Sequence, residues 1–564
     1  MYDQKRTRRA NACVGSVREE EKMKQRRQDN RVREYIAPVR VVLAEGNAER
    51  TELLEGRLAD QIGLNERETV PVRGRCRMLF DFGRELHGGI RLVAGFGKGG
   101  TMVRLRVGES ANEALAELGE KGCTNDHSLR DITVPLPMLS DMEFFNSGFR
   151  FASLEFLDED AECALKAVNA VYVHHPRRRA GSFRCSDPLV EQIYSVAADT
   201  VMLCAQDYIW DGIKRDRLVW MGDLYPEITS LLSVCTDDGC VADSLDFVVN
   251  ETPLPGWMNA YPMYSMWWIM NLAEYYRMTG NRDYVFAQEK YFRGVLEQID
   301  GCIAENGDFD FGMNFIDWPS HEHADEPEGV RCLCRLCAAS ARELESLYGM
   351  DHSLSSRIAE KISRKSAEVT EKRQIAALKL LSGASLSAKE RALVAENGAA
   401  GFSTFMSYFL LSAQSEEAGM PAALSALKEY YGGMLKMGAT SFWEDFDLNW
   451  LQGNVCPIDR IRREGETDIH GDFGKYCYVG YRHSLCHGWS AGVIPFLVRR
   501  VLGIKAEEPG YASVSISPDL GDLEFAEGEI PTPHGILRVS CRREGGKTLT
   551  EVSAPKGIRV EVRK

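Results

Sequence analysis

The spacing of apolar residues divides the chain into regions of different secondary structure. From about residue 35 to 175, segments such as VRVVLAEG, GIRLVAGF and FRFASLEFL alternate apolar and polar residues, and Gly, Asp and Asn separate them. A period of two is typical of strands with one buried face, and frequent turn residues are typical of a sandwich. We therefore predict a β-sandwich domain over residues 35–180.

The spacing becomes helical at Ser186. The segment SDPLVEQIYSVAADTVMLCAQ begins with Ser-Asp-Pro, and proline is well tolerated in the first turn of a helix. Helical spacing continues to about Gly503, which leaves room for roughly a dozen helices of average length. Short connections alternate with long loops rich in Trp and acids. We predict an (α/α)6 barrel over residues 181–505, with its long loops gathered at one mouth.

After Gly503 the pattern returns to alternation, as in YASVSISPDL and ILRVSCRREGGKTLTEVSA, where EGGK is a hairpin signal. We predict a small C-terminal β-sandwich over residues 506–564. Residues 1–34 are highly charged and carry few core-forming residues. They lack the apolar core of a secretory signal, so we expect a disordered or frayed extension, with a nucleic-acid-binding arm as the weaker alternative.

Composition narrows the class of protein. Hydrophobic residues make up 44% and charged residues 27%, which is typical of a globular domain, and the formal net charge is -15. An acidic chain opposes nucleic-acid binding, and we find no apolar run of about 18 residues, so we expect neither nucleic acid nor membrane as a partner. The oligomeric state stays open, with a homodimer among the alternatives.

Cysteine usage indicates reduced thiols. The chain has 16 cysteines and no export signal, which favours the cytoplasm. Cys332, Cys334 and Cys337 are the tightest group, but a second cluster that would complete a metal site is missing. We predict a helix with small buried residues there, and neither a metal nor another cofactor.

The nine tryptophans all lie within the predicted helical domain, between Trp210 and Trp489. Aromatic rings stack on the CH faces of sugars, while carboxylates bind hydroxyl groups, so Trp beside acidic loops is typical of a carbohydrate pocket. A large helical core is the alternative reason for the same distribution. Trp267 and Trp268, in the middle of a predicted helix, favour that alternative.

Charged residues are most concentrated in DGIKRDRLVWMGDLYPE, residues 211–227. Its acids repel one another unless cations lie between them, and one acid in such a cluster can have its pKa raised while the others stay ionised. Trp220 adds an apolar face. We interpret this stretch as half of a glycoside hydrolase site. It contains four acids and three cations: Asp211, Asp216, Asp223, Glu227, Lys214, Arg215 and Arg217.

Glycoside hydrolysis needs a second carboxylate. GATSFWEDFDLNW, residues 438–450, offers Glu444, Asp445 and Asp447 between two tryptophans, and a solvated acidic loop is the alternative. Two further groups are FIDWPSHEH and YRHSLCHGWSAG. Their histidines leave a zinc site open as a hypothesis, although no HExxH-type spacing supports it: His321, His323, His483 and His487.

In these motifs the sequence resembles the α-L-rhamnosidase family, glycoside hydrolase family 78. The resemblance rests on DGIKRDRLVWMGD, FIDW, GATSFWEDFD and SLCHGW in that order, and on DFGRELHGGIRL, RLRVGES, GFRFASLEF and GSFRCSDPLVEQIY before them. It covers nearly everything after residue 35. It implies an (α/α)6 catalytic barrel flanked by β-sandwich domains, and an inverting hydrolysis of terminal α-L-rhamnose.

The resemblance also implies site residues. Asp216 falls at the position of the general acid and Glu444 at that of the general base. The other residues that it implies bind or border the sugar. They are Asp211, Arg215, Trp220, Asp223, Asp317, Trp318, Trp443 and His487.

The chain departs from the family at the acid. Members usually carry Glu at the acid position and Gly three residues later. This chain has Asp216 and Val219 at these two positions. Asp is one methylene shorter, and a misplacement of about 1 Å can cost about 10²-fold in rate. Another (α/α)6 glycosidase, such as a trehalase-like or unsaturated-uronyl hydrolase, and a non-catalytic sugar-binding protein are therefore the alternatives. A helical scaffold for protein partners explains neither the Trp distribution nor the acidic loops.

Overall fold

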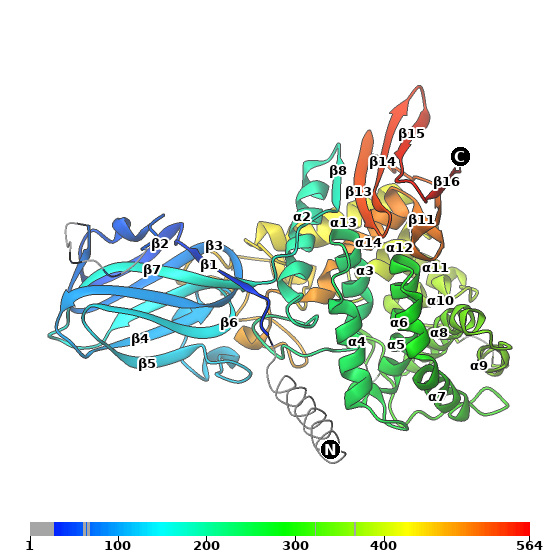
Figure 1. Cartoon of the computed structure of the whole chain (residues 1–564), viewed down its shortest axis with the longest axis horizontal. Helices are drawn as coiled ribbons and strands as arrows, with labels where there is room; N and C mark the ends of the chain where they lie inside the picture. The colour runs from blue at the N-terminus through cyan, green and yellow to red at the C-terminus, as the bar shows by residue number, and fades with distance from the viewer. Residues whose placement is uncertain are drawn as a thin grey trace, which may run out of the picture.

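A computed structural model describes residues 28–59, 62, 64, 68–321, 323–365 and 368–563 (Figure 1). The predicted extension lies mostly outside these residues. Figure 1 shows the N-terminal strands at one end of the molecule, and the helices with the C-terminal strands at the other.

The N-terminal region is rich in sheet, as the alternation predicted. Its seven strands form one hydrogen-bonded sheet in the order β1-β7-β3-β6-β4-β5, with β2 also paired to β3. The strands are β1 (Val32–Ile36), β2 (Arg40–Ala48), β3 (Val70–Gly97), β4 (Thr101–Gly108), β5 (Asp131–Leu136), β6 (Ser140–Phe156) and β7 (Glu162–His174).

The long strand β3 is irregular in its middle. Its pairing with β6 shifts register between Asp81 and Leu86, where Gly83 has a φ of 80°, a conformation that glycine adopts at little cost. Glu85 lies within this irregularity and is buried, and its backbone N–H donates to Thr440 Oγ1 at 2.9 Å. The irregularity therefore joins the sheet to a loop of the helical region.

The middle of the chain is helical, as predicted. Helix α2 begins as expected, because the Asp187 carboxylate accepts from the Leu189 N–H at 3.0 Å and Pro188 occupies the first turn. Trp267 and Trp268 are buried in α5. The helices are α2 (Pro188–Cys204), α3 (Leu224–Val234), α4 (Cys240–Glu251), α5 (Pro262–Thr279), α6 (Arg282–Ala287), α7 (Glu289–Gly301), α8 (Glu326–Tyr348), α9 (Ser353–Ser363), α10 (Arg373–Leu381), α11 (Ala388–Ala395), α12 (Ser407–Ala418), α13 (Met420–Lys436) and α14 (Val493–Phe496).

The C-terminal region consists of two small sheets. One has the order β11-β12-β16 and the other β15-β14-β13-β8. Strand β8 lies directly before α2 in the chain and pairs with β13, so the chain enters the helical region from the C-terminal sheets. The strands are β8 (Ser182–Cys185), β11 (Ile504–Glu508), β12 (Ser513–Ile516), β13 (Phe525–Thr532), β14 (Gly535–Glu544), β15 (Lys547–Ser553) and β16 (Arg559–Val562).

The N-terminal sheet has its own apolar core, whereas the helices and the C-terminal sheets share one large core. Polar contacts join the two parts. The Arg150 guanidinium donates to the Gly438 carbonyl at 2.9 Å, and the Ala111 N–H donates to the Ile458 carbonyl at 2.9 Å. Loops from both parts therefore meet at a polar boundary, and the site lies there. Over the described residues, every helix is too short or too polar to cross a bilayer.

Candidate active site

A cavity of about 300 Å³ lies where the helical loops meet the N-terminal region. Eight of the ten predicted site residues line it, although the chain separates them by up to 276 positions, from Asp211 to His487. The lining residues are His127, Asp211, Arg215, Asp216, Trp220, Asp223, Tyr261, Tyr264, Phe315, Trp318, Glu444, Cys477, Tyr478, Arg482, His487 and Trp489.

Asp216 and Arg217 lie on a turn before α3. Both have a positive φ, 54° and 53°, which costs free energy for residues with a side chain. Backbone groups of the N-terminal region hold this turn, because the Arg217 guanidinium donates to the His127 carbonyl at 2.6 Å and to the Asn146 carbonyl at 2.9 Å. The N-terminal region thus helps to fix the predicted acid.

Glu444 is buried, and donors surround its carboxylate. The Arg215 guanidinium pairs with Oε1, the Ser484 N–H donates to Oε2 at 3.0 Å, and His487 Nε2 lies 3.5 Å from Oε1. The Glu444 carbonyl also accepts from the Trp489 indole N–H at 3.0 Å. Its position is therefore fixed on both the side-chain and the backbone side.

Arg215 connects the two predicted catalytic carboxylates. Its Nη1 lies 3.4 Å from Asp216 Oδ1, while its Nη2 pairs with Glu444. Although burial alone would lower the pKa of the guanidinium, Glu444 and Asp216 raise it. A permanent cation therefore lies between the two acids.

Asp211 and Asp223 are buried acids of a different kind. Burial raises the pKa of Asp211 well above its ordinary value, and the charges of Asp216 and Asp223 raise it further. Burial, followed by Glu444 and Asp216, does the same to the pKa of Asp223, whose Oδ1 lies 3.5 Å from the Tyr264 hydroxyl. A protonated carboxyl group both donates and accepts hydrogen bonds, which suits a sugar hydroxyl.

His487 is buried beside Asp211 and Glu444. Burial, followed by the charge of Arg215, lowers the pKa of the imidazole well below its ordinary value, so the ring is neutral. Its Nε2 lies 3.7 Å from Asp211 Oδ2, and its ring packs on Trp489 with the centroids 4.2 Å apart. A neutral imidazole can donate to a carboxylate or to a sugar hydroxyl.

Aromatic rings form the walls of the cavity. The Trp220 ring meets Tyr261 and Tyr264 edge-on, and the Trp318 ring stacks on Tyr476 with the centroids 5.3 Å apart. Such faces suit the CH face of a sugar or a planar leaving group.

The structure does not bring Asp317 and Trp443 to the cavity lining. Trp443 is fully buried and packs edge-on against Phe446 and His483, so its ring belongs to the core. Asp317 Oδ1 accepts from the Trp318 N–H at 2.9 Å, and Oδ2 accepts from the Ser403 hydroxyl. Asp317 therefore supports the loop that carries Trp318.

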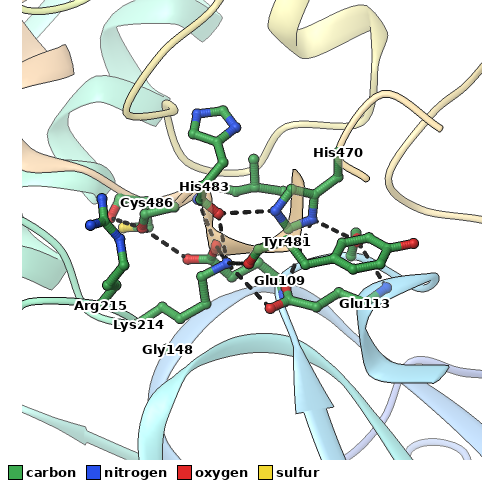
Figure 2. A network of polar contacts seen from close by, with 12 residues as sticks. Glu109, Glu113, Gly148, Lys214, Arg215, His470, Tyr481, His483 and Cys486 are labelled. Carbon is green, nitrogen blue, oxygen red and sulfur yellow. Dashed lines mark hydrogen bonds and ion pairs between the residues drawn. The ribbon is translucent and has the colours of Figure 1, made fainter. Parts of the chain in front are cut away.

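A buried polar network is centred on Lys214 and Glu109 (Figure 2). Lys214 Nζ pairs with Glu109 at 2.9 Å and donates to the Tyr481 and His483 carbonyls at 2.9 and 2.6 Å. Glu109 in turn accepts from the Ser484 hydroxyl at 3.3 Å and from the Leu485 N–H at 2.6 Å. Since the Ser484 N–H holds Glu444, the N-terminal region fixes the backbone that positions the predicted base.

Within the described residues, Glu109, Glu113 and His470 are the group whose spacing would allow a metal ion. Lys214 pairs with both glutamates, and Arg130 pairs with Glu113, so cationic side chains already neutralise these acids. The zinc alternative finds no support at His483, because its Nε2 accepts from the Asp445 N–H at 2.9 Å.

A larger cleft of about 720 Å³ lies between the helices and the C-terminal sheets. Its buried acid, Glu274, accepts from Arg277 at 2.8 Å and from Arg499 at 2.9 Å. Because both partners are fixed arginines and the lining contains no Trp, we do not regard this cleft as the sugar site.

Sequence reasoning missed several cavity residues. His127 comes from the segment between β4 and β5, far from the acidic motifs, and carries no local signal. Arg482 is the second residue of the motif YRHSLCHGWSAG, and Tyr478 lies three residues before it. Their closeness to this motif in the chain was the signal that could have identified them. Tyr261 and Tyr264 flank the start of a predicted apolar helix and were hidden by its core-like composition.

Two family models match this chain. The bacterial alpha-L-rhamnosidase 6 hairpin glycosidase domain matches residues 178–332, and the bacterial alpha-L-rhamnosidase C-terminal domain matches residues 503–563. The first match contains the site residues from Asp211 to Trp318, and the second match begins after His487. The predicted resemblance to the α-L-rhamnosidase family is confirmed.

Individual relatives agree with this class. An α-L-rhamnosidase of Alteromonas sp. (strain LOR) is 28% identical over 167 residues, which are 28% of this chain and 15% of that protein. The fold is similar to that of the family 78 rhamnosidase of Bacillus sp. GL1, with a TM-score of 0.69 and 22% identity over 87% of this chain and 53% of the other. The chain therefore spans only part of the length of these relatives.

A third relative matches along most of its own length. A rhamnosidase from Klebsiella oxytoca, solved with rhamnose bound, has a TM-score of 0.61 and 16% identity over 83% of this chain and 96% of the other. At such identities the likeness concerns the fold alone.

Proposed function

We propose that this chain is an inverting glycoside hydrolase that removes terminal α-L-rhamnose, or a closely related sugar, from small glycosides or oligosaccharides. The observation that carries the proposal is Arg215, which contacts both Asp216 and Glu444 within one aromatic-walled cavity. The rhamnosidase-type family matches support the choice of sugar.

In this proposal Asp216 is the general acid and Glu444 the general base. Asp216 gives its proton to the glycosidic oxygen while the bond from that oxygen to the anomeric carbon breaks. Glu444 takes a proton from a water molecule that attacks the opposite face of the sugar, so the configuration inverts. Arg215 keeps the charge between the two carboxylates balanced during both transfers.

The remaining residues would bind the sugar. Protonated Asp211 and Asp223 exchange hydrogen bonds with its hydroxyls, neutral His487 donates one more, and Trp220 and Trp318 border the ring. A cavity of about 300 Å³ suits a single sugar unit, which supports action on a terminal residue. We further propose that α2 to α14 form an (α/α)6 barrel that carries these loops at one mouth.

A panel of aryl glycosides tests the function. We expect the chain to release aryl alcohol from the α-L-rhamnoside faster than from the arabinoside, fucoside or glucuronide, and NMR to detect the β-anomer of rhamnose first. Faster release from another sugar would favour a different (α/α)6 glycosidase. Binding of rhamnosides without any hydrolysis would favour a sugar-binding protein.

The cellular setting remains a prediction. The cysteines of the described part of the chain are all free, and only Cys302 and Cys477 are not buried. Free thiols are typical of a reducing compartment, so we propose a cytoplasmic enzyme that needs no cofactor.

A further inference from the structure

A loop of the N-terminal region reaches the turn that carries Asp216. The loop lies between β4 and β5, and the Ser128 hydroxyl donates to the Lys214 carbonyl at 3.3 Å. Arg482 pairs with Asp126 from the other side, and Arg217 donates to the His127 carbonyl at 2.6 Å. Contacts from both parts of the molecule therefore fix the backbone at His127.

The His127 side chain points to the same carboxyl group. It lines the cavity, and its Nε2 lies 3.3 Å from Asp216 Oδ1 and 3.8 Å from Asp126 Oδ2. Arg215 Nη1 contacts the same Asp216 oxygen at 3.4 Å. Over the described residues both contacts are with Oδ1 and none is with Oδ2, so Oδ2 is the oxygen left for a proton and a substrate.

We propose that His127 and Asp216 act as a pair in protonating the leaving group, so that the N-terminal β region supplies part of the catalytic machinery. This inference rests on the proposed glycosidase function. His127 is a positioning residue: its N–H holds Oδ1, which presents Oδ2 to the glycosidic oxygen.

The protons balance over one turnover. The proton on Asp216 Oδ2 moves to the glycosidic oxygen, and the electron pair of the breaking carbon–oxygen bond stays on that oxygen. Asp216 is left as a carboxylate, which the His127 N–H and Arg215 stabilise. Before the next turnover, Glu444 releases to solvent the proton that it took from the attacking water, and Asp216 takes up a proton from solvent at Oδ2 while the His127 ring stays at Oδ1.

The test compares two substrates whose leaving groups differ in their need for a proton. A dinitrophenolate leaves as a stable anion, whereas a methoxide must be protonated as it leaves. We expect His127→Ala to lower kcat about 10-fold to 100-fold on methyl α-L-rhamnoside, less than the loss of the general acid itself, and to change it little on dinitrophenyl α-L-rhamnoside.

His175→Ala is the matched control. His175 also belongs to the N-terminal region and lies 3.4 Å from an aspartate, Asp207, but it does not line the cavity. We expect the wild-type ratio of the two substrates in this variant, and an unchanged midpoint of thermal unfolding in both variants.

Two results would overturn the inference: an equal loss on both substrates in His127→Ala, or no loss on the methyl glycoside. Either result leaves the proposed function intact as long as the wild-type chain turns over both substrates. If the wild-type chain hydrolyses neither these rhamnosides nor any other glycoside of the aryl panel, the proposed function itself fails.

Discussion

Asp216 and Glu444 share one arginine but lie in very different surroundings. Glu444 is 3% exposed and has donors on both oxygens, and its backbone carbonyl is hydrogen-bonded as well. The side chain of Asp216 is 19% exposed, lies on a left-handed turn and has donors on one oxygen. The base is thus fixed before a substrate arrives, while the acid lies closer to solvent, where a leaving group must depart.

The residues that support Glu444 and Asp216 also differ in burial. Glu444 is backed by Ser484, Glu109 and Lys214, which are all buried, whereas Asp216 is backed by the partly exposed loop of His127. Burial makes hydrogen bonds to a charge stronger and their loss more costly. Substitutions at the two residues should therefore have different consequences.

The largest effect is expected at the base. Glu444→Gln keeps the shape of the side chain but cannot take a proton from water, so kcat should fall by about 10⁴-fold, at the upper end for acid–base catalysis. The measurement is steady-state hydrolysis of the aryl rhamnoside. Asp447→Asn, in the same loop but outside the cavity lining, should keep wild-type turnover. Full activity of Glu444→Gln would remove this residue from the mechanism.

Asp216→Asn should have a smaller effect that depends on the substrate. We expect a loss of about 10²-fold to 10³-fold on methyl α-L-rhamnoside and a much smaller loss on the dinitrophenyl glycoside, because only the first needs the proton. Comparison of kcat for the two substrates checks this. A loss as uniform as that of Glu444→Gln would mean that Asp216 is not the acid.

The network behind Glu444 should matter for stability. Lys214→Met leaves Glu109 and Glu113 buried without one of their cations, and breaking a buried pair costs about 3–5 kcal/mol. Urea unfolding measures the change. The control is Lys121→Met, which breaks the partly exposed pair with Asp472 and should cost at most about 1 kcal/mol. An equal decrease in the free energy of unfolding in both variants would show that the buried pairs stabilise the fold no more than the exposed pair.

The last prediction concerns stability and not turnover. Burial raises the pKa of Asp317 to about 7, although the Ser403 hydroxyl opposes this. A carboxyl group with a raised folded pKa stabilises the fold below its unfolded pKa and loses that contribution as the pH rises through the folded value. Between about pH 4 and pH 7 the free energy of unfolding of the wild type should therefore decrease relative to that of Asp317→Asn.

Urea unfolding at several pH values across that window measures the difference. Because Asp317 lies outside the cavity lining, the pH dependence of kcat/KM should stay that of the wild type in Asp317→Asn. A parallel pH dependence of stability in the two proteins would place the titration elsewhere.

Local sequence was informative where neighbours in the chain are also neighbours in space. Asp211, Arg215, Asp216, Trp220 and Asp223 line one cavity together because a short turn and the start of α3 keep them close. Trp443 lies next to Glu444 in the chain, yet its ring is in the core, because consecutive side chains point in different directions and adjacency does not say which one faces the cavity.

The sequence by itself determined the order of the sheet-rich and helical regions, the start of α2, and the acidic cluster of residues 211–227, because periodicity, capping and charge density are local properties. Only the tertiary structure decided that His127 meets Asp216 and that Lys214 and Glu109 hold the backbone behind Glu444. These contacts join residues from two separate cores, and only the packing of those cores brings them within hydrogen-bonding distance.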